Sequence, residues 1–124
     1  MSQSEEYFVP SLFIAFSHCF AHGYDLRVGL RQQQLETASG YWTLIRYNPA
    51  FRAAGKKPFV LDSPRPTIPL RDYAYNENRY KVLTKSNPEE AERLMVMAQE
   101  TVDRRWETYE HLAKQEPAQF ERAG

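Results

Sequence analysis

The chain has 124 residues, of which 42% are hydrophobic and 14% aromatic, which is the composition of a globular protein and not of a disordered tail. Its 16 basic residues balance its 16 acidic ones, so no net field attracts it to nucleic acid or to an anionic membrane, and no apolar run approaches the roughly 20 residues of a membrane helix. The polar, acidic first residues are unlike a signal peptide, and the single cysteine is typical of a reducing compartment, so we expect a cytoplasmic protein.

The first expected element is a strand over residues 12–16, which are apolar without interruption. An alternating pattern would indicate one solvated face, whereas this one predicts a strand covered on both faces, as in a parallel sheet flanked by helices. A buried helix is the alternative, but Pro10 and the polar residues Ser17 and His18 bracket too short a run for it. Residues 18–24 would then form the loop at the carboxyl end of the strand, where ligands gather in open α/β sheets.

A helix is predicted next, from about Asp25 to Ser39, with Asp25 as its N-cap and Gly40 just after its end. Gly29 would allow close packing against a neighbouring helix. Three leucines form a narrow apolar stripe and four polar residues form the other face: Leu26, Leu30 and Leu35 on the first, and Gln32, Gln33, Gln34 and Glu36 on the second. The stripe predicts which face is buried.

The middle of the chain favours a small β-hairpin followed by an extended arm. Residues 41–47 are rich in aromatic and β-branched residues and predict a strand, with residues 59–62 as its antiparallel partner. Four prolines between positions 58 and 69 favour a stiff, ordered arm that lies over another surface. A short helix is expected over residues 76–84.

The last element is a long helix from about Pro88 to about Lys114. Asn87 suits the N-cap, and Pro88 and the acidic residues after it suit the first turn. Apolar residues recur at helical spacing: Ala91, Met95, Ala98, Val102, Trp106, Tyr109 and Ala113. His111 lies outside this pattern, so it is expected to be a surface histidine.

One cluster of soft ligands, formed by His18, Cys19 and His22, lies in the loop expected after the first strand. The commonest role of a free cysteine is that of a small buried apolar residue, and this interpretation stays open. The spacing does not match known zinc sites, while a nucleophilic Cys–His pair remains an alternative. An iron–sulfur ligand is the sharper hypothesis, although a cubane needs four thiolates and this chain supplies one.

The residues around this cysteine, Ser17-His18-Cys19-Phe20-Ala21-His22-Gly23, resemble the pyruvate:ferredoxin (flavodoxin) oxidoreductase family at the end of its thiamine-diphosphate domain. The resemblance covers roughly residues 7–115. It continues through Gly29-Leu30-Arg31-Gln32-Gln33, Arg46-Tyr47-Asn48-Pro49, Ile68-Pro69-Leu70, Asp72-Tyr73 and Arg104-Arg105-Trp106. The Ser-His-Cys-x-Ala-His-Gly core is its most specific part.

The resemblance implies that Cys19 is the fourth thiolate of the [4Fe–4S] cluster nearest the thiamine cofactor, with His18, His22 and Gly23 in the loop beside that cluster. Enzymes of this family decarboxylate pyruvate on thiamine diphosphate, pass electrons through [4Fe–4S] clusters to ferredoxin or flavodoxin, and transfer the acyl group to coenzyme A. The other three cysteines and the motif that holds magnesium and diphosphate are missing here. Thiamine diphosphate and magnesium are therefore expected in the parent enzyme and not in this chain alone.

The expected fold is an α/β fragment: one buried strand of a parallel thiamine-diphosphate-fold sheet, a helix, a small β-hairpin, a proline-rich arm and a long C-terminal helix. Residues 1–40 would be the terminal strand, loop and helix of a thiamine-diphosphate-binding domain. Residues 41–124 would form a C-terminal extension with the hairpin, the arm and the long helix.

The expected function is that of the C-terminal portion of such an oxidoreductase. This portion would be inactive alone and would join the remainder of the polypeptide, which is expected to form a homodimer and to meet ferredoxin or flavodoxin. One alternative is a non-catalytic docking or oligomerisation module built from the proline arm and the long helix. Another is a small independent metal protein that uses His18, Cys19 and His22. No nucleic-acid or membrane partner is expected.

Overall fold

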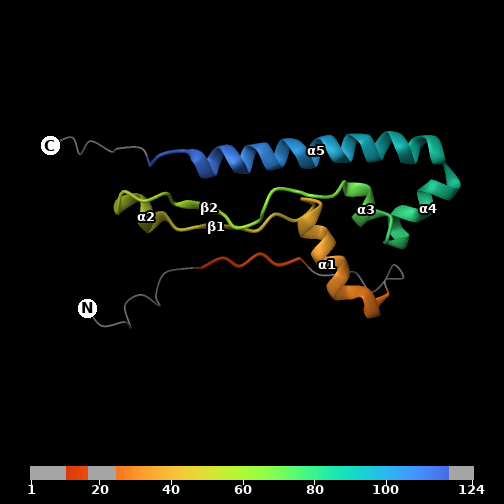
Figure 1. Cartoon of the computed structure of the whole chain (residues 1–124), viewed down its shortest axis with the longest axis horizontal. Coiled ribbons are helices and arrows are strands. Elements are labelled where there is room, and N and C mark those ends of the chain that lie inside the picture. The colour runs from red at the N-terminus through yellow and green to blue at the C-terminus, as the bar shows by residue number, and fades with distance from the viewer. Residues whose placement is uncertain (1–10, 17–24, 118–124) are drawn as a thin grey trace.

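The computed structural model describes residues 11–16 and 25–117 (Figure 1). In chain order its elements are a 3₁₀ turn η3 (Leu26–Val28), helix α1 (Gly29–Ala38), strand β1 (Ile45–Tyr47), helix α2 (Pro49–Ala53), strand β2 (Phe59–Leu61), and helices α3 (Leu70–Ala74), α4 (Asn78–Ser86) and α5 (Pro88–Lys114). In these ranges the fold is α/β, with five α-helices and one two-stranded antiparallel sheet. No helix among them is long and apolar enough to cross a bilayer.

Helix α5 spans the molecule, and the sheet, the proline arm and α3 lie along one side of it (Figure 1). It forms over the predicted residues: the Asn87 Oδ1 accepts a hydrogen bond from the Glu90 N–H at 3.2 Å, and Pro88 occupies the first turn. The predicted apolar stripe faces the rest of the chain. Its buried members are Ala91, Met95, Val102 and Trp106. This prediction is confirmed.

The core lies between α3 and α5, where Leu70, Tyr73 and Ala74 pack with Met95 and Val102. Partly buried side chains surround it: Leu35, Tyr41, Tyr75, Tyr80 and Ala98. Helix α3 was not predicted, because five residues after a run of prolines show too little of a helical period. Helix α4, which follows α3, lies two residues later than expected at both ends.

The predicted hairpin is present, but its strands are shorter than expected, since residues 41–44 and residue 62 are not part of β1 or β2. The two strands pair antiparallel so that Arg46 faces Val60. The Arg46 guanidinium also donates two hydrogen bonds to the Asp62 carboxylate, at 2.7 and 2.8 Å. The connection between β1 and β2 contains α2, which was not predicted. The Asn48 Oδ1 caps this helix by accepting a hydrogen bond from the Ala50 N–H at 3.0 Å. Residues 48 and 49 thus repeat the Asn-Pro start of α5.

The proline arm is ordered, as predicted, and lies over this chain's own elements. The Ser63 Oγ accepts a hydrogen bond from the Leu44 N–H at 2.7 Å, which ties the start of the arm to the hairpin. Further along, the Thr67 N–H donates to the carbonyl oxygen of Ala38 at 2.8 Å. The arm therefore connects the sheet to the end of α1.

The strand predicted over residues 12–16 is not present in this chain. Residues 11–16 form neither helix nor strand, and Leu12, Phe13 and Ile14 are 85%, 91% and 73% exposed. A strand needs neighbours that satisfy its backbone N–H and C=O groups. The two strands of the described sheet pair with each other, and no parallel sheet exists in the described ranges. Burial of this segment was expected in the sheet of a larger domain, so it stays a prediction that this chain by itself does not test.

Helix α1 is confirmed, but the predicted buried face is only partly right. The Asp25 carboxylate caps η3 by accepting from the Arg27 N–H at 3.0 Å, and Gly40 follows the helix with φ +77°. Leu35 packs against the core as predicted, but Leu26 and Leu30 are 61% and 80% exposed. Gly29 is buried, and so are Gln32 and Glu36, which were predicted to be solvated.

Candidate functional site

The predicted site residues His18, Cys19, His22 and Gly23 all lie in residues 17–24, outside the described ranges. Their roles therefore stay predictions. Within the part of the chain that the structure describes, no group of three or more His, Cys, Asp or Glu side chains is placed to hold a metal ion. Because the chain has one cysteine, a four-thiolate cluster would need three thiolates from elsewhere.

The segment that precedes this stretch is attached to the core through one aromatic side chain. The ring of Phe16 lies edge-on to Tyr41, with 5.7 Å between the ring centroids, and 5.4 Å from the ring of Trp42. Tyr41 in turn lies 4.9 Å from the buried ring of Tyr73. Phe16 is therefore fixed against the core, while the side chains of residues 12–14 are not.

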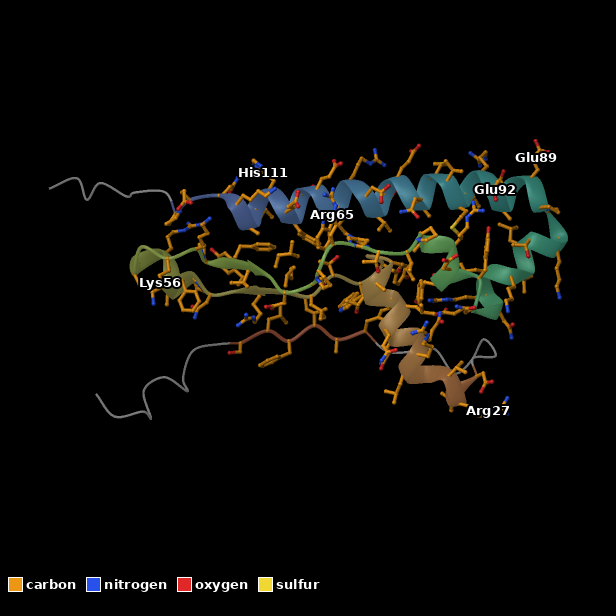
Figure 2. All side chains as sticks on the ribbon, in the orientation of Figure 1. Arg27, Lys56, Arg65, Glu89, Glu92 and His111 are labelled. Carbon is orange, nitrogen blue, oxygen red and sulfur yellow. The ribbon has the colours of Figure 1, made fainter. Side chains whose placement is uncertain are left out.

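The segment that follows begins with a short-range ion pair. The Arg27 guanidinium contacts the Asp25 carboxylate at 2.9 Å, and the hydrogen bond from Arg27 lowers the pKa of the Asp25 carboxyl. Figure 2 shows Arg27 at the far end of the η3–α1 segment from α5. In the same view His111 points away from the sheet on the outer side of α5, and it is exposed, as predicted. Arg27 and His111 are therefore far apart in the molecule.

Large apolar side chains are exposed in the two segments that border residues 17–24. We call them the outward apolar surface: Leu12, Phe13, Ile14, Leu26, Val28 and Leu30. Both segments lie on the side of the sheet away from α5 (Figure 1). An exposed apolar surface of this kind marks an interaction site more often than a free surface.

On the side opposite the exposed Leu30, polar side chains of α1 point into the molecule. The Glu36 side chain is only 4% exposed, and its Oε1 accepts a hydrogen bond from the hydroxyl of the fully buried Tyr73 at 3.1 Å. The Gln32 Nε2 donates to the carbonyl oxygen of Tyr73 at 2.9 Å and to the Glu77 Oε1 at 3.4 Å. Three hydrogen bonds thus hold α1 to α3 and to the turn after α3.

Glu77 links this contact to α4. Its Oε2 pairs with the Arg79 Nε at 2.5 Å, and the Arg79 guanidinium lies over the ring of Tyr80, 4.7 Å from its centroid. We call the five connected residues the polar network: Gln32, Glu36, Tyr73, Glu77 and Arg79. It contains two carboxyl groups and one guanidinium.

The buried position of the polar network shifts two of its pKa values. Burial raises the pKa of the Glu36 carboxyl because desolvation penalises its charged form, and the charge of Glu77 adds to this shift. The hydrogen bond from Tyr73 and the charge of Arg79 act in the opposite direction and do not cancel it. Burial and both carboxylates raise the pKa of the Tyr73 phenol, so its hydroxyl keeps its proton as a donor.

Sequence reasoning missed the polar network because it placed Gln32 and Glu36 on the solvated face. A signal was present: Gly29, Gln32, Glu36 and Ser39 recur at spacings of three and four and are all buried. Because Gly29 has no side chain, a neighbouring element can approach α1 closely on the face that contains Gly29, and Gln32 and Glu36 lie on that same face. The partners of Gln32, however, are 41 and 45 residues away, beyond any local pattern.

Comparisons with known proteins place the chain beside much longer enzymes. No family model matches it. The pyruvate-flavodoxin oxidoreductase of Nostoc sp. is 46% identical over 111 residues, which are 90% of this chain and 9% of that enzyme. The chain is homologous to a short segment of these oxidoreductases. The pyruvate-flavodoxin oxidoreductase of Rhodospirillum rubrum is 43% identical over 91% of the chain, and the pyruvate:ferredoxin oxidoreductase of Moorella thermoacetica is 40% identical over 90%.

The resemblance indicated by the residues around Cys19 is therefore confirmed along nearly the whole chain. The chain spans about a tenth of the length of the curated oxidoreductases that it matches. Their names describe enzymes that act on pyruvate together with flavodoxin or ferredoxin.

Proposed function

We propose that this chain is the carboxyl-terminal portion of a pyruvate:ferredoxin or pyruvate:flavodoxin oxidoreductase and that it works only when bound to the remainder of that polypeptide. The observation that carries the proposal is the identity of 40–46% to such enzymes along nine-tenths of this chain. The outward apolar surface supports it, because a segment cut from a larger fold leaves exposed the side chains that the larger fold would cover.

In this proposal Cys19 supplies one thiolate to the [4Fe–4S] cluster nearest the thiamine cofactor, and the remainder supplies the other three. His18, His22 and Gly23 shape the loop beside the cluster, where backbone N–H groups that bond to the sulfurs raise the reduction potential. Thiamine diphosphate and magnesium belong to the remainder. The described residues contain no ligand set that would hold the cluster without it.

The assembled enzyme is proposed to decarboxylate pyruvate oxidatively to acetyl-CoA. The two electrons released pass through [4Fe–4S] clusters to ferredoxin or flavodoxin. The cofactors supply this chemistry, and the contribution of this chain is to complete one ligand set. We place the enzyme, as a homodimer, in the cytoplasm.

Residues 12–16 are proposed to become a strand of the parallel thiamine-diphosphate-fold sheet when the remainder is present. Their uninterrupted apolar pattern suits a strand with two covered faces. Residues 1–40 would then close the thiamine-diphosphate-binding domain, and residues 41–124 would form an extension from it. The exposed Leu12, Phe13 and Ile14 are the side chains that this change would bury.

The test is to co-express this chain with the Nostoc enzyme from which the matching segment has been deleted. The chain carries Cys19→Ser, or the control His111→Ser at an exposed position, or neither. We expect all three complexes to form, and only Cys19→Ser to lose the proximal cluster signal in electron paramagnetic resonance and the pyruvate-dependent reduction of a viologen dye. Intact cluster signals in Cys19→Ser would refute the ligand role. The absence of any complex would refute the proposed function.

A further inference from the structure

We propose that Glu36 is a positioning residue: its hydrogen bond within the polar network fixes the rotation of α1, so that α1 and the η3 turn before it present Leu30 and Leu26 to the remainder of the oxidoreductase. The identity of that partner rests on the proposed function. The orientation of α1 rests only on contacts within this chain.

Hydrophobicity alone does not set the rotation of α1, because its apolar residues do not share one face. Leu35 packs against the core, whereas Leu30 and the preceding Leu26 of η3 are exposed. On the inward side, Gln32 and Glu36 are buried. Polar groups are buried at such cost only when their hydrogen bonds are satisfied. The hydrogen bonds of the polar network are therefore what selects this face.

The network is anchored on more than one side. From α3, Tyr73 supplies both a hydroxyl donor to Glu36 and a carbonyl acceptor to Gln32. From the turn before α4, Glu77 accepts from Gln32 and pairs with Arg79. Rotation of α1 by one face would break the contacts of both Gln32 and Glu36 at once.

The remaining charged and titratable groups on this side of α1 are engaged elsewhere. From α5, the Arg105 guanidinium donates to the carbonyl oxygens of Gly40 and Tyr41, directly after α1. Tyr41 and Tyr80 contribute phenols, and burial raises the pKa of Tyr80. The guanidinium nearest in the network, Arg79, is paired with Glu77. Glu36 is left with a neutral donor, the hydroxyl of Tyr73.

A buried carboxylate with no cation of its own is costly, whereas the protonated acid is neutral. The polar network is therefore most stable when Glu36 carries a proton. Because burial raises its pKa, the stabilisation is fully present below the pKa of the unfolded chain and is lost as the pH rises through the higher pKa of the folded chain. Above the folded-state pKa of Glu36, the polar network stabilises the orientation of α1 less.

The first experiment uses the full chain and compares the wild type with Glu36→Gln, which keeps the shape of the protonated acid without its titration. We expect the folding constant of the wild type to fall by up to about tenfold per pH unit through the titration. Urea unfolding between pH 4 and pH 8 should show no such fall in Glu36→Gln, and the exposed control Glu107→Gln should follow the wild type. Identical profiles for wild type and Glu36→Gln would overturn the proposal.

The second experiment measures hydrogen exchange of the α1 amides and keeps the test valid if one variant is unstable. Tyr73→Phe removes the donor to Glu36 and should lower the protection of α1 more than that of α5. Unchanged protection of α1 in Tyr73→Phe would overturn the proposal. This result does not depend on any partner.

The third measurement is the affinity of the chain for the Nostoc enzyme that lacks the matching segment. Tyr73→Phe should bind about tenfold more weakly than the wild type, and Glu36→Gln at least as tightly, because its α1 keeps the docking orientation. Equal binding by Tyr73→Phe and the wild type would overturn the positioning role. Failure of every variant to bind would count against the proposed function, while the exchange data on α1 alone would still stand.

Discussion

Gly40 is the residue at which the end of α1, the proline arm and α5 meet. Its φ of +77° is one that residues with a side chain rarely adopt. A Cβ atom there would lie 2.7 Å from the Cγ of Pro66 and 3.1 Å from the Cγ1 of Val102. Neither neighbour can yield easily, since one is a closed ring and the other lies buried on a helix. Gly40 thus permits the close approach of three elements.

Gly40→Ala should lower the free energy of unfolding by about 3 kcal/mol, from the left-handed backbone and the contact with Pro66 together. Gly55→Ala is the matched control, because its φ is +71° and nothing lies within 4 Å of the added Cβ. It should cost only about 1 kcal/mol, for the backbone alone. Urea unfolding of both variants measures the difference, and equal losses would contradict the account of this junction.

At the scale of the element, two helices begin with the same dipeptide but differ in what they bury. Asn87 caps α5, which supplies part of the core, whereas Asn48 caps α2, which has no buried residue. An N-cap contributes to global stability only when its helix is part of the cooperative core. The two caps therefore make a matched pair.

Asn87→Ala should lower the free energy of unfolding by about 1 kcal/mol, since the Glu90 N–H loses its acceptor at the start of α5. Asn48→Ala should change it by less than about 0.5 kcal/mol, because α2 can fray without disturbing the core. Chemical denaturation followed by far-ultraviolet circular dichroism distinguishes the two. A loss in Asn48→Ala as large as that in Asn87→Ala would show that α2 is part of the core.

Leu30, the exposed leucine of α1, gives a prediction that separates docking from folding. Leu30→Glu should leave the free energy of unfolding within about 0.5 kcal/mol of the wild type, because Leu30 makes few contacts within this chain. It should weaken binding to the Nostoc enzyme that lacks the matching segment by about tenfold or more. Val96→Glu, at an exposed apolar position of α5, is the control and should bind as the wild type does. Equal affinities for the two variants would remove α1 from the interface.

The sequence predicts those elements whose pattern is long enough to be read locally. The 27 residues of α5 repeat their apolar spacing many times, and Asn87 and Pro88 mark its start. Helices α2 and α3 escape prediction because each has five residues. The burial of Gln32 and Glu36 in α1 escapes it for a different reason: their partners are Tyr73 and Glu77, whose positions depend on the folded chain. The polar network was missed with it.

The residues of the candidate site were also only partly predictable from the sequence. Cys19 was singled out by its place after an apolar run and by a resemblance whose extent the comparisons confirm. Its role as a ligand stays a prediction. The outward apolar surface was expected to be a buried strand and a buried stripe, since a sequence pattern indicates that a side chain will be covered but not by which polypeptide. Leu12 and Leu30 are exposed here, and the proposed function assigns their cover to the remainder of the oxidoreductase.

At the scale of the whole molecule, the outward apolar surface should make the isolated chain associate with itself. Large apolar side chains in solvent at this density favour contacts between copies when the natural partner is missing. We expect sedimentation velocity at micromolar concentrations to show a mixture of oligomers and thermal melting to be irreversible. A monodisperse monomer with a sharp, reversible transition would contradict this prediction.

The isolated chain should also be inactive. Pyruvate-dependent reduction of a viologen dye requires a thiamine site and complete clusters, and one cysteine cannot hold a cubane. We expect no turnover from the purified chain, and turnover only after the remainder has been added. Activity of the chain alone would refute its assignment as a portion of a longer enzyme.

The most direct test of the account is hydrogen exchange of this chain, free and mixed with the Nostoc enzyme from which the matching segment has been deleted. We predict that the amides of residues 11–16 and of η3 and α1 exchange more slowly in the complex, while the amides on the exposed side of α5 do not change. Protection confined to α5, or no complex at all, would contradict the claim that the outward apolar surface is covered by the rest of an oxidoreductase.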